Sequence, residues 1–93
     1  MAHLISYDLN KPGQNYDDLY EAIKRLGAWW HYLDSTWIVK SSYSAPEIFE
    51  KLKPHIDKND TVLVIEITSE YSGWLPQKAW DWLREKVREA AYS

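Results

Sequence analysis

Asp8 is the residue whose type and position most suit catalysis. It stands near the end of an apolar segment, directly before a loop with a lysine and a glycine. A carboxylate there can hold Mg²⁺, which needs only one or two carboxylates because waters and phosphate oxygens complete its coordination. Two copies of the chain would supply Asp8 twice, and the metal would activate a water for phosphodiester cleavage. The commoner use of such an aspartate is to accept backbone N–H groups of the loop that follows.

The loop over residues 10–15 is a candidate phosphate site. Its backbone N–H groups can cradle a phosphate, with Lys11 as the point charge beside Asn10 and Gly13. The loop matches no P-loop or dinucleotide-binding motif. A plain turn is the simpler interpretation, because Asn, Pro and Gly all favour turns.

Aromatic side chains are the third source of candidate chemistry. The 93 residues include six Trp, seven Tyr and one Phe, several of them close together in the segment 29–37. Aromatic rings stack on nucleobases for roughly 1–3 kcal/mol each. Trp30 and Trp37, with Ser35 between them, are therefore candidate ligand-binding residues. Aromatic residues are also ordinary strand formers, so we expect at least half of them in the core.

Other chemistries find little support in the sequence. The three histidines are single and widely spaced, and the chain has no cysteine, so neither a disulfide nor a thiolate zinc site is expected. No serine has a histidine placed to activate it. The net charge of −3 argues against a broad electrostatic grip on duplex nucleic acid. Lysines and arginines near the C-terminus alternate with glutamates, as on a solvated helix face.

Four strands and three helices are predicted to position these residues. Apolar alternation and apolar runs predict strands over His3–Leu9, Trp29–Leu33, Thr36–Lys40 and Thr61–Thr68. Helical spacing predicts helices over Tyr16–Leu26, from a capping box at Ser44–Glu47 to about Pro54, and over Pro76–Ala91. Gly27 is expected as the left-handed C-cap of the first helix.

This order predicts one α+β domain over residues 1–93. Right-handed crossovers turn the order βαββαβ into a ferredoxin-like, antiparallel four-stranded sheet with both helices on one face. The core of this domain spans residues 3–68, and the helix over 76–91 is an addition to it. The last strand is expected at an edge of the sheet, next to the first strand.

The apolar character of that last strand indicates that another surface covers it. Edge strands normally carry charge or proline to block pairing, whereas Thr61–Thr68 is apolar on both faces. The C-terminal helix or a second copy of the chain must cover it. We expect a homo-oligomer, a dimer or larger, and the alternative is a monomer closed by its own helix. The predicted interface residues are Val62, Val64, Trp74, Trp80 and Trp82.

A membrane partner is not expected. No apolar run reaches the ~18 residues that a membrane span needs. The start of the sequence lacks the charged and apolar regions of a signal peptide. The expected location is the cytoplasm.

Several of these residues also carry a family resemblance. With Tyr7-Asp8-Leu9, Gly27 and the segment Asp34–Val39, residues 3 to 67 resemble the small CRISPR-associated endonuclease family, the partner of the spacer integrase. The resemblance implies a ferredoxin-like homodimer in which Asp8 matches the metal-binding aspartate. The chain is also similar to a widespread set of small bacterial and phage proteins, a resemblance that implies no particular activity.

Three functions remain open at this point. The favoured one is a non-catalytic, homo-oligomeric binding module for a nucleotide-like ligand or nucleic acid, of the kind used in phage or bacterial defence. It is favoured because the sequence has surplus aromatics, an unprotected strand and no complete catalytic set. The alternatives are a Mg²⁺-dependent phosphodiesterase that uses Asp8 from two protomers, and a protein-interaction module that works through Trp74–Trp82.

Overall fold

The described part of the chain folds around a four-stranded sheet. The computed structural model describes residues 1–9, 16–68 and 70–92, and the side chains of the last helix as far as Lys86. The strands are β1 (Ala2–Asp8), β2 (Ala28–Leu33), β3 (Thr36–Lys40) and β4 (Thr61–Ile67). Their order is β2-β3-β1-β4, and every neighbouring pair is antiparallel. The last strand therefore lies at an edge beside the first, as predicted.

Within the described residues, three α-helices accompany the sheet: α1 (Asp17–Lys24), α2 (Ala45–Leu52) and α3 (Gln77–Tyr92). The predicted capping box begins α2: the Glu47 backbone N–H donates to Ser44 Oγ (3.3 Å), and the Ser44 N–H donates to Glu47 Oε1 (3.0 Å). Because a proline interrupts helical hydrogen bonding, α2 gives way to a 3₁₀ turn over Lys53–His55. The predicted end near Pro54 is confirmed.

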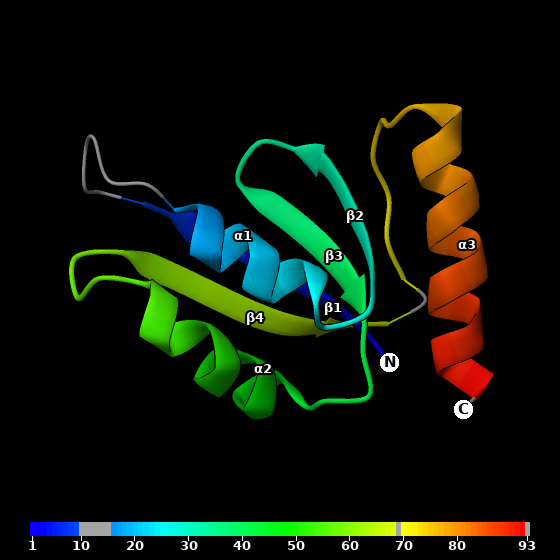
Figure 1. Cartoon of the computed structure of the whole chain (residues 1–93). Helices are drawn as coiled ribbons and strands as arrows, with labels where there is room; N and C mark the ends of the chain where they lie inside the picture. The colour runs from blue at the N-terminus through cyan, green and yellow to red at the C-terminus, as the bar shows by residue number, and fades with distance from the viewer. Residues whose placement is uncertain (10–15, 69, 93) are drawn as a thin grey trace.

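Two of the helices, α1 and α2, cover one face of the sheet, and α3 stands beside the end where the chain begins (Figure 1). Successive side chains of a strand point to opposite faces of the sheet, so every second residue of each strand faces α1 and α2. The main core lies between these layers and contains the buried residues Ile5, Tyr7, Tyr16, Leu19, Ala22, Ile23, Leu26, Trp37, Val39, Ile48 and Leu52. We call this side of the sheet the helix face.

The opposite face of the sheet, here called the second face, is only partly covered. A smaller buried cluster joins α3 to the sheet through Ala2, Trp30, Ile38, Ala79 and Leu83. On β4, however, Leu63 is 52% exposed and Ile65 is 49% exposed. The C-terminal helix therefore covers the end of this face near Ala2 and leaves an apolar strip along β4 open.

Gly27 is not the left-handed C-cap that the sequence predicts. The C-cap of α1 is Arg25, in ordinary helical conformation, and Gly27 lies two residues further on with φ +153°. A Cβ at this position would lie inside the contact distance of the Lys40 carbonyl oxygen. Glycine is therefore required because β3 approaches the backbone closely where β2 begins.

His3 is a buried histidine without a partner. Its side chain lies on the helix face of β1, and both ring nitrogens lack a hydrogen-bond partner in the described part of the chain. Burial lowers the pKa of His3 below its ordinary value of 6.5; Glu66 on β4 opposes this shift, and the N-terminal ammonium adds to it. His3 is therefore neutral in the folded chain near pH 7.

We expect His3 to make the fold sensitive to acid. Unfolded His3 has the higher pKa and binds the proton first, so stability is lost as the pH falls below about 6.5, by about 1.4 kcal/mol for each unit of pKa difference. His3→Leu removes this loss. Urea denaturation at pH 8 and pH 5 should show a smaller drop in the free energy of unfolding for the variant. Equal drops in both proteins would show that His3 plays no part.

Candidate functional site

Trp37 is the fixed centre of the largest aromatic cluster. It is buried on the helix face of β3, and its Nε1–H donates to the hydroxyl of Tyr7 on β1 (2.9 Å). Tyr20 of α1 stacks against it, with ring centroids 6.2 Å apart and planes 25° apart. Burial raises the pKa of Tyr7, and the bond from Trp37 opposes that shift. These contacts hold the indole in one orientation.

Two rings of β2 extend this cluster to the surface. The imidazole of His31 lies flat on Trp37, with centroids 3.8 Å apart and planes 13° apart. Trp29 packs on Trp37 at 5.3 Å and is 43% exposed. His31 Nε2 also lies 3.2 Å from the Asp34 carbonyl oxygen. Trp29, His31 and Trp37 form what we call the ring stack, a buried indole with two solvent-facing rings upon it.

Charges of opposite sign flank the ring stack. At the end where β2 begins, Lys24 of α1 holds its ammonium 5.3 Å from the centroid of the Trp29 ring and 3.4 Å from Glu21. At the other end, the β2–β3 turn carries Asp34. The Tyr7 backbone N–H donates to the carbonyl oxygen of Ser35 (3.0 Å), so this acidic turn lies beside the end of β1. The ring stack therefore runs from a basic end to an acidic one.

The predicted ligand-binding residues do not form one site. Trp37 belongs to the ring stack, and Ser35 lies in the turn at its acidic end. Trp30 is buried on the second face beneath α3, and its Nε1 has no partner in the described part of the chain. Trp30 and Trp37 are separated by the sheet and cannot bind one ligand. The predicted loop residues Asn10, Lys11 and Gly13 lie outside the described residues.

Trp29 and His31 belong to the site but are not among the ligand-binding residues that the sequence predicts. The available signal was strand alternation, which puts positions 29 and 31 on one face of β2. The register then places Trp29 directly opposite Val39, a neighbour of Trp37 on the helix face. Sequence alone does not give this register, because a bulge interrupts the β2–β3 pairing between Trp30 and Leu33.

Asp8 is exposed at the last residue of β1, opposite Thr61 of β4. Among the side chains of residues 1–9, 16–68 and 70–86, no three histidine or acidic groups gather in a group that would hold a metal ion. Asp8 thus offers a single carboxylate per chain. Such a carboxylate meets only the minimum requirement of a Mg²⁺ site, which waters and phosphate oxygens would have to complete.

The predicted interface residues occupy three different environments. Val62 and Val64 pack against the main core on the helix face. The exposed residues of β4 are instead Leu63 and Ile65, which point to the second face. Trp80 and Trp82 of α3 are half-buried against the smaller cluster. Trp74, in the segment before α3, is 99% exposed. Of the five residues, Trp74 alone is freely accessible.

Comparisons with known proteins add no family. No model of a protein family matches the sequence, and no curated protein matches it significantly. Among the helices of the described chain, none has both the length and the apolar character needed to cross a bilayer.

Proposed function

We propose that this chain is a non-catalytic, homo-oligomeric binding module for a nucleotide-like ligand or a short single strand of nucleic acid. The fold that we assign to it is ferredoxin-like with an added helix. Support for this assignment comes from the strand order β2-β3-β1-β4, from the antiparallel pairing throughout, and from the position of α1 and α2 on one face.

The observation that carries the proposal is the stack of His31 on Trp37. A planar ring 3.8 Å above a buried indole, at an angle of 13°, is already held in the orientation that a nucleobase needs for stacking. His31 is exposed to solvent, and Trp29 adds a second exposed ring beside it. Because these rings are ordered before a ligand arrives, little entropy is lost on binding.

The charges at the two ends of the ring stack would orient a bound nucleotide. A phosphate is attracted to the basic end, where Lys24 and the exposed Arg25 close α1, and is repelled by Asp34 at the turn. A base would therefore stack near His31 with its phosphate toward Lys24. A net charge of −3 suits a small anionic ligand better than a duplex, which requires a basic surface.

The homo-oligomer in the proposal rests on the second face. Leu63 and Ile65 expose about half of their side chains on an edge strand whose outer backbone groups have no neighbouring strand in the sheet. Natural sheets usually protect such an edge, because it invites pairing with another chain. A second copy of the chain supplies that protection.

We expect Trp29→Ala to weaken nucleotide binding by about 1–3 kcal/mol, roughly 5- to 150-fold in Kd, because stacking contributes about that much per base. Titration calorimetry with nucleoside monophosphates and short oligonucleotides measures the change. Tyr32→Ala is the matched control, since this ring is 48% exposed on the same strand but packs on Trp30 of the second face. Equal binding by wild type and Trp29→Ala, or no binding by wild type, would refute the ring stack as the site.

A further inference from the structure

Trp74 is the most exposed large hydrophobic residue in the described part of the chain. It lies between β4 and α3, in the segment that rises along the side of α3 (Figure 1), and 99% of its surface is open to solvent. A single exposed apolar residue needs no explanation of its own. A cavity that would suit an indole, however, lies a few residues away.

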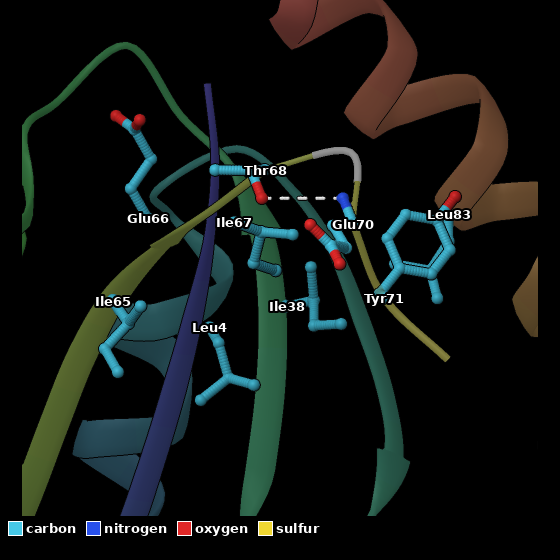
Figure 2. A pocket seen from close by; sticks show the side chains of 9 residues that line it. All are labelled: Leu4, Ile38, Ile65, Glu66, Ile67, Thr68, Glu70, Tyr71 and Leu83. Atoms are coloured by element: carbon cyan, nitrogen blue, oxygen red, sulfur yellow. Dashed lines mark hydrogen bonds between the residues drawn. The ribbon is translucent and has the colours of Figure 1, made fainter. Parts of the chain in front are cut away.

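This cavity opens between β4 and α3 and has a volume of about 320 Å³. Apolar side chains from three strands and α3 form most of its wall, and its lining residues are Leu4, Ile38, Ile65, Glu66, Ile67, Thr68, Glu70, Tyr71 and Leu83. In Figure 2 the carboxylate of Glu70 points in among these apolar groups, whereas that of Glu66 points away. We call this cavity the β4–α3 pocket.

The chemistry of the pocket matches an indole. A cavity of about 150 Å³ accommodates a benzene, so this one has room for a two-ring side chain. A buried indole also needs an acceptor for its N–H. Glu70 can provide one: among the described residues its carboxylate has no ion-pair or hydrogen-bond partner, and no lysine or arginine lines the pocket.

Trp74 does not fill the pocket of its own chain, because it is almost fully exposed. It is nevertheless only three residues from Tyr71, which lines the pocket, at most about 11 Å along the backbone. A protruding group and a matching cavity so close together form a self-complementary surface. Such a surface suits a two-fold dimer, in which each copy makes the same contact to the other.

We propose that Trp74 of one copy inserts into the β4–α3 pocket of a second copy, and that the second copy returns the same contact. This inference rests on the homo-oligomer of the proposed function and identifies its interface. Each inserted indole would bury roughly 150–250 Å², so the pair covers only part of the 1,200–2,000 Å² of a stable interface. Ile65 in the pocket wall and Leu63, exposed on the same face of β4, supply further apolar area.

The dimer should depend strongly on Trp74. Tryptophan at the centre of an interface is a typical hot spot, and its truncation weakens association by about 30-fold or more. Sedimentation velocity of the full chain, over a series of protein concentrations, should show this rise in the dimer dissociation constant for Trp74→Ala. The fold is not at risk, because Trp74 is 99% exposed in the monomer. Leu33→Ala, 49% exposed on β2, is the control and should associate as wild type does.

A mixing experiment tests the reciprocal exchange itself. Ile65→Trp fills the pocket from its own chain and leaves Trp74 intact, whereas Trp74→Ala leaves the pocket empty. Neither variant alone can make the contact, but a mixture makes it once per heterodimer. The mixture should therefore contain more dimer than either variant alone. Circular dichroism confirms that both variants are folded.

Each remaining outcome has a distinct meaning. If wild type dimerises and Trp74→Ala does so equally well, or if mixing restores nothing, the Trp74 contact is refuted and the proposed function stands. If wild type stays monomeric at every concentration, both the contact and the homo-oligomer are refuted, and nucleotide binding at the ring stack is still tested by Trp29→Ala. If the size of the assembly keeps increasing with protein concentration beyond a dimer, the copies associate head to tail, and the two-fold exchange is refuted.

Discussion

Gly27→Ala should destabilise the folded chain by roughly 2–6 kcal/mol, the combined cost of a strained backbone and an overpacked contact. The added Cβ would collide with the carbonyl oxygen of Lys40, and a φ of +153° is unfavourable for any residue with a side chain. A domain of this size is stable by only about 5–15 kcal/mol, so the loss is a large fraction of the total. Urea denaturation followed by circular dichroism measures it.

Gly73→Ala is the matched control for this substitution. A Cβ at Gly73 meets nothing within 4 Å, and its φ is not positive. Alanine there should be neutral, or stabilise the chain by about 0.4–1 kcal/mol, because it restricts the unfolded state. Equal effects at the two glycines would mean that β3 does not approach Gly27 as closely as the structure shows.

Ile5→Ala should cost about 2–5 kcal/mol of folding stability, the usual range for truncating a fully buried isoleucine. Ile5 lies on the helix face of the central strand β1, in the middle of the main core. The cavity left behind cannot collapse easily, because the sheet and both helices hold its walls. The free energy of unfolding in urea gives the value directly.

Ile65→Ala is the comparison that makes this result informative. The same change on the second face of β4 removes a side chain that is 49% exposed, so it should cost less than about 1 kcal/mol at low protein concentration. At high concentration its effect should appear in association. Similar folding losses at Ile5 and Ile65 would show that both faces of the sheet are equally covered within one chain.

The outline of the fold follows from the sequence because its signals are local. The capping box at Ser44 marks the start of α2, and the apolar run after Thr61 marks β4. The chain order then requires β4 to lie beside β1 at an edge. Each of these steps uses propensity, spacing or the handedness of a crossover, all of which can be read from one sequence.

The faces of the strands were harder to predict. Because β4 is apolar at consecutive positions, its pattern has no period that identifies the buried side. The register with β1 determines which side chains of β4 are buried: Val64 pairs with buried Ile5, and Ile65 pairs with Leu4 on the second face. The register of β2 with β3 likewise puts Trp30 and Trp37 on opposite faces, although the sequence predicts both as ligand-binding residues.

The candidate sites depend still more on tertiary structure. The sequence does not mark His31 as a ligand-binding residue, because no neighbouring residue forms a binding motif with it. Its role becomes visible only in the folded hairpin, where its ring stacks on Trp37. The sequence does not separate the two uses of glycine that apply at Gly27, the helix cap and the close approach of another strand. The pocket beside Trp74 joins β1, β3, β4 and α3, which no local pattern connects.

The central claim is that a second copy of the chain completes the open second face. The most direct test follows the indole N–H resonances of the six tryptophans by NMR over a dilution series, with Trp74→Phe identifying one of them. Trp74 should shift markedly as protein concentration rises, whereas buried Trp37, bonded to Tyr7, should not. A Trp74 resonance that keeps the position of a fully solvated indole at every concentration would contradict the claim.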